Sequence, residues 1–508
     1  MSALFYKNIV AAKNGSLIPE FNSGRAAHSK YNPEREGDLF LQDKSGLLFA
    51  LVIGAGGGYQ IQSLAKRNPN CKILVIEKSA ADLEYLRQKI PCVQELFKNK
   101  SIVFSSSDEP GQIESALFEN YFPAHHGDLT IAALRPWAEE AGELYKNILA
   151  RIEETTKKIA ADFSTQARFG GLWQKNIFCN LKILKKLKNR QPIKIDTKKI
   201  AAVIAAGPSL DKSIQKIEKA REKYFVVATD TAHKILCRRK IAADAIVSID
   251  AQFLSAEHFN APICKDAIFV LDLAGNHSIA NFANQFGGKI LFANLGHPLT
   301  SFISLYCKRP FVRLSSGGGT VTIAALDFAK KCGFSKVEIF GADFGYSSGK
   351  AYARGSYLDD LYRVKESRVQ NSQSEFTKLM FRSPLKKKPD GILQSQLLLS
   401  YQQSLEEFLR GAKWKKEDSI YECEFSDFEP KGQSIFASEE NKLDFDKLRQ
   451  GMKEALDIAE KSEGLLPQSA LLLPSMAYYE GKNSQNKISP KEAKNLALNK
   501  ILLYNAML

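Results

Sequence analysis

Short apolar runs that alternate with helix-like stretches constrain the fold of this chain more than any other feature. Each run is followed by glycine or polar residues. The runs after residue 199 are Ile200–Ala205, Tyr224–Ala228, Ala245–Ile249, Ile268–Leu271, Lys289–Ala293 and, after a helix at Val321–Lys331, Val337–Phe340. Continuous apolar runs are typical of parallel strands that are buried on both faces, with helices covering those faces. This region is therefore predicted to be an α/β domain with a mostly parallel sheet.

A second unit of the same kind lies nearer the start of the chain. The apolar run Leu47–Ile53 ends in the glycine turn Gly54–Gly58, and a helix-like stretch then leads to a second run, Lys72–Ile76, which is followed by Glu77. A strand, a glycine turn, a helix, a strand and an acidic residue form the first βαβ unit of a doubly wound sheet. The fold class predicted is α/β, with tandem Rossmann-like domains and a helical C-terminal domain.

The pattern divides the chain into four parts. Residues 1–137 are the N-terminal Rossmann-like domain, 138–195 a helical connector, 196–436 the central catalytic domain and 437–508 a small helical domain. Helical periodicity over Glu139–Leu187 predicts the connector. The polar stretch Asp359–Gly391 has few apolar anchors, and we expect it to be a long surface excursion or lid.

Charge and targeting signals limit the classes of partner and compartment. Of 508 residues, 71 are Lys or Arg and 56 are Asp or Glu, which gives a net charge of +15 and suits anionic partners. The basic residues are diffuse and hardly interleaved with aromatics, which argues against nucleic-acid binding. No apolar stretch reaches the length of a membrane helix, and the start lacks a signal-peptide pattern. We expect a cytoplasmic protein without membrane insertion; the sequence leaves the oligomeric state open.

Cysteines and histidines are spaced in ways that disfavour several enzyme classes. The 8 cysteines are scattered singly without a CxxC pair, which argues against a zinc module or a disulfide framework and suggests buried thiols. No HExxH, nucleophile elbow or GxxxxGK[ST] loop is present. The sequence therefore indicates no metal site and no obligatory cofactor, although a divalent metal that assists the reaction stays open.

The first glycine turn has two interpretations. Backbone N–H groups at Gly54, Gly56 and Gly58 could approach a nucleotide while Glu77 accepts from ribose hydroxyls. The sequence GAGGG is not GxGxxG, and such turns also occur where a sheet has no bound cofactor. A second nucleotide site and a purely structural turn are both compatible with the pattern.

The turn after Ile200–Ala205 is more informative. Gly207 permits close approach, Pro208 fixes the turn, and the Ser209 hydroxyl with nearby helix N-terminal amides can hold a phosphate or sugar oxygen. Ser209 could instead be a plain helix cap. Thr229 and Asp230 follow the next strand, where open α/β sheets bind their ligands.

Further polar groups are predicted at the same edge of the sheet. Asp250 follows the strand Ala245–Ile249, and there it could act as a base, bind ribose or cap a helix. The turn Ser316, Gly317 and Gly318 before the helix Val321–Lys331 offers another anion cradle. The loop after Val337–Phe340 brings together a carboxylate, two phenols and an ammonium group, a mixture that packing alone explains poorly. These four side chains are Asp343, Tyr346, Tyr352 and Lys350.

Five segments of the chain resemble the motility-associated factor (Maf) flagellin glycosyltransferases, in the order found in that family. They are Thr165–Leu181 (TQARFGGLWQKNIFCNL), Val203–Asp211 (VIAAGPSLD), Ala243–Gln252 (ADAIVSIDAQ), Ser315–Gly333 (SSGGGTVTIAALDFAKKCG) and Val337–Gly355 (VEIFGADFGYSSGKAYARG). The same core is similar to small bacterial sialyltransferases, in which a GPSL turn, a Ser-Gly turn and a Gly-x-Asp-Phe loop surround a CMP-sugar. Two tyrosines hold the leaving phosphate there, and Tyr346 and Tyr352 match them once one inserted residue is allowed.

The resemblance implies a function for the whole chain. It implies transfer of a nonulosonic acid, of the pseudaminic or legionaminic type, from a CMP-sugar to Ser or Thr of flagellin, in support of flagellar assembly and motility. Gly207, Pro208, Ser209, Thr229, Asp230, Ser316, Gly317, Gly318 and Lys350 would bind the donor, and the outer domains would serve as scaffold and acceptor dock.

The chain departs from those sialyltransferases at the expected base. They have asparagines near the positions of Ala206 and Asp230, and a histidine downstream of the Asp-Phe loop, whereas the last histidine here is His297. The base would be a carboxylate, an earlier histidine, or no strong base at all. Of these we expect Asp250 or Asp343.

Two rival functions remain from the same residues. The core family also includes archaeal 6-hydroxymethylpterin diphosphokinases, which use ATP and a pterin, and magnesium-dependent ATP binding would favour that reading. A non-catalytic protein that binds flagellin as an accessory is the other rival, and the missing downstream histidine supports it.

Overall fold

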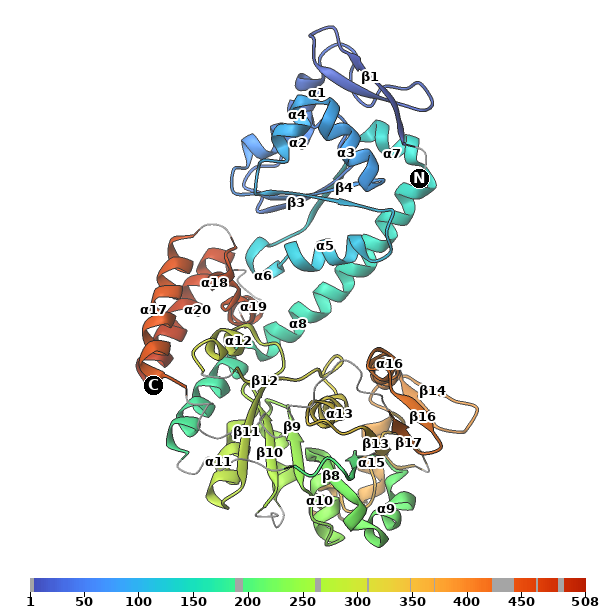
Figure 1. Cartoon of the computed structure of the whole chain (residues 1–508), viewed down its shortest axis with the longest axis vertical. Coiled ribbons are helices and arrows are strands. Elements are labelled where there is room, and N and C mark those ends of the chain that lie inside the picture. Colours follow the sequence, from blue (N-terminus) through green and yellow to red (C-terminus); the bar gives the residue numbers. More distant parts are fainter. Residues whose placement is uncertain are drawn as a thin grey trace. The chain divides into compact units, whose positions relative to one another are not determined.

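The computed structural model describes residues 4–187, 195–260, 266–307, 310–347, 349–369, 371–422, 443–462, 465–482 and 488–508. The chain forms two compact units (Figure 1): residues 1–171 with 454–502, and residues 172–453 with 503–508. The four segments predicted from the sequence are thus arranged in two units, and the segment boundary near residue 436 lies outside the described residues.

The first unit contains a four-stranded parallel sheet in the order β5-β4-β3-β6. Its strands are β3 (Phe49–Ile53), β4 (Lys72–Glu77), β5 (Ile102–Ser106) and β6 (Thr130–Ala133). Helices α2 (Tyr59–Arg67), α3 (Ala80–Lys89), α4 (Pro91–Leu96) and α5 (Gln112–Asn120) lie between the strands in the chain. Every residue of β3 is buried, so the continuous apolar run forms a central strand as predicted.

The remaining elements of the first unit precede and follow this sheet in the chain. An antiparallel hairpin comes first, and a group of helices from two distant parts of the sequence completes the unit. These elements are β1 (Tyr6–Ala11), β2 (Leu17–Phe21), α1 (Pro33–Leu39), α6 (Pro123–His126), α7 (Arg135–Ala141), the first part of α8 (Glu143–Lys186), the last part of α17 (Phe445–Lys461), α18 (Pro467–Ala470), α19 (Leu473–Lys482) and most of α20 (Pro490–Ala506). The 44-residue α8 confirms the helical periodicity predicted for Glu139–Leu187.

The second unit contains a nine-stranded sheet in the order β12-β11-β10-β9-β8-β7-β13-β17-β16. All neighbours from β12 to β13 are parallel, whereas β17 and β16 pair antiparallel. The strands are β7 (Ile200–Ile204), β8 (Tyr224–Thr229), β9 (Ala245–Ser248), β10 (Ile268–Asp272), β11 (Lys289–Asn294), β12 (Val312–Arg313), β13 (Lys336–Phe340), β16 (Lys415–Glu417) and β17 (Ile420–Glu422). The predicted α/β class and parallel sheet are confirmed.

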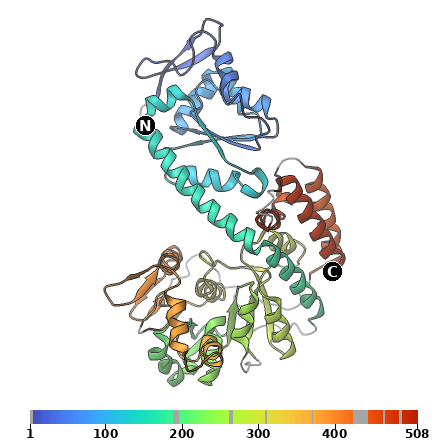
Figure 2. The same ribbon diagram turned by 180° about the vertical axis from the view of Figure 1, so that it is seen from behind.

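Helices cover both faces of this sheet (Figures 1 and 2). One face packs against α13 (Val321–Lys331) and α16 (Gln396–Gly411) in a core that includes Val203, Val227 and Val247. Other helices connect consecutive strands of the sheet and cover the other face. These are α9 (Leu210–Lys219), α10 (Asp230–Arg238) and α11 (His277–Gln285); η1 (Arg221–Lys223), η2 (Phe253–Phe259) and α12 (Pro298–Ser304) complete the connections.

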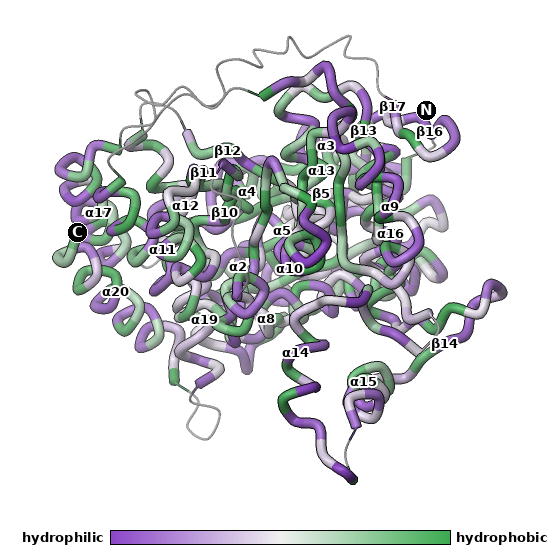
Figure 3. The backbone as a smooth tube through the Cα atoms, turned by 90° about the horizontal axis from the view of Figure 1, so that it is seen from below, coloured by the Kyte–Doolittle hydropathy of each residue, from purple (hydrophilic) through white to green (hydrophobic). Residues whose placement is uncertain are grey.

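The polar stretch Asp359–Gly391 is more regular than the predicted surface excursion. It includes most of α14 (Tyr357–Val364), all of α15 (Ser372–Met380) and β14 (Leu385–Lys387), which pairs with β15 (Leu393–Ser395). Figure 3 shows these elements projecting from the sheet, with many hydrophilic residues. The buried ammonium of Lys234 on α10 lies 2.6 Å from a carboxylate oxygen of Asp360 and so ties α14 to the sheet.

None of the described helices combines the length and the apolar character that crossing a membrane requires. Even the long α8 carries charged residues along its length.

We predict that Gly170→Ala destabilises the first unit. Gly170 lies in α8, and a Cβ there would overlap the carbonyl oxygen of Pro474 at α19, which is backbone and cannot rotate away. Overpacking of this kind costs about 1–3 kcal/mol. Urea unfolding should show the loss, whereas the control Gly411→Ala, where nothing lies near the added methyl, should be neutral or slightly stabilising. Equal unfolding midpoints for both variants would contradict the packing described.

Candidate functional site

The strand order of the second unit reverses between β7 and β13. From β7 the chain adds β8 to β12 in one direction, and then returns to place β13 on the other side of β7. At such a switch point the loops after the two central strands diverge, and open α/β sheets bind ligands there. The predicted turns Ala206–Asp211 and Gly341–Tyr346 are these two loops. We call the residues at this edge that follow β7, β8, β9 and β13 the carboxyl-edge site.

Backbone hydrogen bonds join the two loops directly. The N–H of Gly207 donates to the carbonyl of Gly341 at 2.7 Å, and the N–H of Ala353 donates to the carbonyl of Ala206 at 2.9 Å. A Cβ on Gly207 would overlap the Gly341 carbonyl and the Asp343 carboxylate, so glycine is required for this approach. The chain after β13 therefore folds back over the turn after β7.

The Asp343 side chain is hydrogen-bonded to the turn after β7. Its Oδ2 accepts from the N–H of Ser209 at 3.0 Å, so an anion of the chain itself lies at the start of α9. Next to it, Phe344 has φ +45°, a left-handed conformation that is rare for a bulky residue. Its carbonyl accepts from the Gln394 side chain at 2.8 Å. Such local strain clusters at functional sites.

Lys350 and Asp211 form an ion pair across the two loops. The ammonium of Lys350 donates to Oδ2 of Asp211 at 2.8 Å, and the N–H of Arg354 donates to Oδ1 at 2.9 Å. Burial alone would raise the pKa of Asp211, but these two donors outweigh it and lower that pKa. The predicted phosphate-binding cation is thus already paired with a carboxylate.

The two predicted tyrosines lie on the segment that folds back. Tyr346 exchanges backbone hydrogen bonds with Leu393, at 2.8 and 2.9 Å, which fixes its place in the loop. Burial, then Tyr346 and Asp230, raise the pKa of Tyr352. The Tyr352 phenol therefore stays protonated at neutral pH and can donate a hydrogen bond.

Thr229 ends β8 and Asp230 begins α10, and both side chains are buried. The hydroxyl of Thr229 donates to the carbonyl of Ile204 at 3.2 Å and so joins the ends of β8 and β7. Asp230 accepts from the Ser248 hydroxyl at 2.8 Å and from the N–H of Thr231 at 2.7 Å. Burial raises the pKa of Asp230, and the negative charge of Asp250 adds to that rise. The carboxylates predicted after β8 and β9 therefore lie in one electrostatic neighbourhood.

The turn Ser316–Gly318 lies at the start of α13. Gly317, Gly318 and Gly319 all have positive φ, which only glycine adopts readily. A Cβ on Gly317 would contact Ile323 and Ser404, which places this turn beside α16. The contacts found among the described residues join the turn to α16 and not to the turn after β7.

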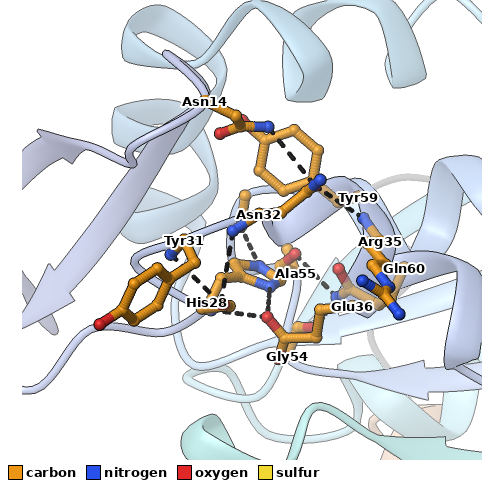
Figure 4. A network of polar contacts seen from close by, with 12 residues as sticks. Asn14, His28, Tyr31, Asn32, Arg35, Glu36, Gly54, Ala55, Tyr59 and Gln60 are labelled. Carbon is orange, nitrogen blue, oxygen red and sulfur yellow. Dashed lines mark hydrogen bonds and ion pairs between the residues drawn. The ribbon is translucent and has the colours of Figure 1, made fainter.

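The glycine turn of the first unit lies at a switch point too, between β3 and β6. Side chains of the same chain fill the space around it: added Cβ atoms at Gly54 and Gly56 would overlap Trp137, Leu134 and His28. Nε2 of His28 accepts from the N–H of Gly57 at 2.8 Å, and Figure 4 shows the imidazole among the turn residues, with Glu36 close by.

Glu77, the predicted ribose-binding acid, is fully buried. Its carboxylate accepts from the hydroxyl of Tyr6 at 3.0 Å, from the N–H of Ala55 at 2.9 Å, from the indole of Trp137 at 2.6 Å and from its neighbour's N–H at 2.8 Å. Burial raises the pKa of Glu77 and these four donors oppose the rise. The acid therefore binds the N-terminal hairpin and the chain after β6 into the core.

A separate pocket, open to solvent, lies in the first unit. It is mostly apolar, with Phe118, Tyr121 and Phe163 in its wall and Asp162 as its charged group. None of the predicted site residues lines it.

Polar residues on α8 that the sequence reasoning missed position the edge of the sheet. The amide of Asn176 donates to the carbonyls of Ala251 and Ala274, at 3.0 and 3.3 Å, and its oxygen lies 2.8 Å from Nδ1 of His277. The side-chain amide of Asn180 likewise donates to the carbonyls of Leu273 and Gly275, at 2.9 and 3.0 Å. Two asparagines four residues apart among buried apolar residues were the available signal.

The described residues contain no group of three or more His, Cys, Asp or Glu side chains that could hold a metal ion. Four cysteines, Cys71, Cys92, Cys179 and Cys332, carry free thiols, while Cys264 and Cys423 lie outside the described residues.

Comparison with known proteins adds four findings. Residues 173–349, all in the second unit, match a family described as "6-hydroxymethylpterin diphosphokinase MptE-like". This match confirms the predicted resemblance to the pterin diphosphokinase-like domain. An uncharacterised protein of Treponema pallidum (strain Nichols) is 34% identical over 150 residues, which is 29% of this chain and 71% of that protein.

The chain belongs to the family of this treponemal protein. A second uncharacterised protein of Treponema pallidum is 35% identical over 136 residues, which is 26% of this chain and 48% of that protein. Among solved structures, a MAf glycosyltransferase from Magnetospirillum magneticum AMB-1 is similar over 98% of this chain and 86% of its own, at 15% identity and a TM-score of 0.47. A likeness of that degree carries no argument about function.

We predict that Trp137→Phe costs more stability than Trp414→Phe. Both indoles are buried, but Trp137 donates to Glu77 whereas the indole N–H of Trp414 has no partner among the described residues. Loss of a donor to a buried carboxylate costs about 1.5–3 kcal/mol. Urea unfolding of both variants measures the difference, and an equal loss in the two would contradict the role given to Glu77.

Proposed function

We propose that the chain is a cytoplasmic glycosyltransferase of the Maf type. It transfers a nonulosonic acid of the pseudaminic or legionaminic type from a CMP-sugar to a Ser or Thr hydroxyl of flagellin, in support of flagellar assembly and motility. The donor lies at the carboxyl-edge site, and the reaction needs no obligatory cofactor. The observation that carries the proposal is the joining of the turn after β7 to the loop after β13 at the switch point of the sheet.

The chemistry of the site suits departure of a nucleotide phosphate. Negative charge develops on that phosphate as the bond to the sugar breaks, and donors held in place stabilise it. Tyr352, with a raised pKa, offers such a donor beside Tyr346. Four of the five segments that resemble the Maf family, and part of the fifth, lie in the second unit, which supports a donor site there.

A specific observation favours a second candidate. The family matched by residues 173–349 is described by a pterin diphosphokinase. If that chemistry applied here, ATP with magnesium and a hydroxymethylpterin would occupy the same edge. Both candidates transfer a group from a nucleotide to a hydroxyl, so ligand binding distinguishes them.

We predict that CMP raises the melting temperature of the chain and that Tyr352→Phe lowers kcat much more than it weakens CMP binding. Removing one donor to developing charge costs about 10²–10³ in kcat. The matched control is Tyr224→Phe, because the Tyr224 hydroxyl donates to buried Glu338 at 2.9 Å from the opposite end of β8. That variant should lose stability and keep its kcat.

The measurements are thermal shift, donor affinity by calorimetry and turnover with flagellin. Stabilisation by ATP, magnesium and a pterin, without any by CMP, would establish the diphosphokinase instead. Binding of flagellin without turnover of any donor would favour an accessory protein. Unchanged kcat in Tyr352→Phe would remove this tyrosine from the reaction.

A further inference from the structure

A buried histidine lies beside the carboxyl-edge site and belongs to none of the predicted turns. His258 is on η2, eight residues after Asp250, and its side chain is 7% exposed. Its Nδ1 is buried and has no hydrogen-bond partner among the described residues. The ring contacts Tyr357 of α14 edge to face, with centroids 4.3 Å apart. A buried polar atom without a partner calls for an explanation, and a catalytic role is one such explanation.

Charged groups from each neighbouring segment face this imidazole. Burial lowers the pKa of His258, and Lys234 of α10 lowers it further. Asp230 at the start of α10, Asp250 after β9 and Glu257 on η2 raise it, but the sum stays below the ordinary value. Burial lowers the pKa of the neighbouring His233 of α10 to about 4, and His258 adds to that lowering. His258 is therefore neutral at neutral pH and able to accept a proton.

Asp230, whose charge acts on this histidine, is held in a fixed orientation. One of its oxygens accepts from the hydroxyl of Ser248 and the other from the N–H of Thr231. A carboxylate fixed in this way cannot turn aside, and it favours the imidazolium that a base becomes after proton transfer.

The two carboxylates expected to act as base are engaged elsewhere. Asp343 accepts from the N–H of Ser209 and fastens the turn after β7. One oxygen of Asp250 accepts from the N–H of Gln252 at 2.9 Å and so shapes its own loop. His258, by contrast, has a ring nitrogen without a hydrogen-bond partner among the described residues.

We propose that His258 is the general base of the carboxyl-edge site and that the charge of Asp230 stabilises its protonated form. The inference rests on the proposed function. In the step, the acceptor oxygen forms a bond to the anomeric carbon of the sugar while the bond from that carbon to the CMP phosphate oxygen breaks. The electron pair of the broken bond leaves with CMP, and the proton of the acceptor hydroxyl passes to His258.

The test compares His258→Gln with His233→Gln. His233 is buried, and its ring stacks on Phe259 of η2 at 5.4 Å, so its replacement disturbs the same packing without removing the proposed base. For His258→Gln we expect kcat for transfer to fall about 10²–10⁴-fold, with CMP affinity unchanged. His233→Gln should keep kcat within a small factor.

A pH profile supplies a readout that a merely structural role would not move. Wild-type kcat should fall as the pH drops through the pKa of His258, because the protonated imidazole cannot accept a proton. Asp230→Asn removes a negative charge that raises this pKa, so the fall should move to lower pH. The profile keeps the inference testable even if His258→Gln fails to fold.

Each outcome separates this inference from the proposed function. If the wild type transfers the sugar and folded His258→Gln has the same kcat, His258 is not the base. The proposed glycosyltransferase function would then still stand. A wild-type pH profile without an acid limb, or one that Asp230→Asn does not move, overturns it as well. Absence of both CMP binding and transfer in the wild type overturns the proposed function and with it the inference.

Discussion

The approach of two backbone loops at Gly207 and Gly341 is the contact on which the second unit's site depends. Strand order reverses there, so the chain after β7 and the chain after β13 must share one edge of the sheet. They do so through a hydrogen bond between main-chain atoms that leaves no room for a Cβ at Gly207. Asp343 then holds the turn by its side chain. The tyrosines and Lys350 follow on the chain that this contact folds back.

The two sheets share a reversal of strand order, but the surroundings of that reversal differ between them. Each reverses strand order beside a strand that ends in a glycine turn. In the first unit, Trp137, Leu134 and His28 fill the space at the turn, and Glu77 is saturated by donors of its own domain. In the second unit the edge retains a buried imidazole with an unpartnered nitrogen near two carboxylates. In the first arrangement Nδ1 of His28 lies 3.6 Å from a carboxylate oxygen of Glu36, whereas in the second Nδ1 of His258 has no hydrogen-bond partner among the described residues.

The strands were predictable because burial on both faces demands unbroken apolar runs, as in Ile200–Ile204. The loops at the carboxyl edge followed from strand direction alone. The hydrogen-bond and ion-pair partners of the polar side chains could not be predicted from the sequence. Lys350 pairs with Asp211 across 139 positions of the chain, and Asp343 binds the backbone of Ser209 across 134. Those contacts depend on where β13 returns, which no local pattern encodes.

Hydrogen exchange with and without CMP tests the central claim most directly, because it reports each backbone N–H of both switch points in one experiment. The account predicts that saturating CMP slows exchange in residues 206–211 and 341–347, with no change in residues 54–58 of the first unit. Slowed exchange at 54–58, with residues 206–211 and 341–347 unchanged, would contradict the assignment of the site to the second unit.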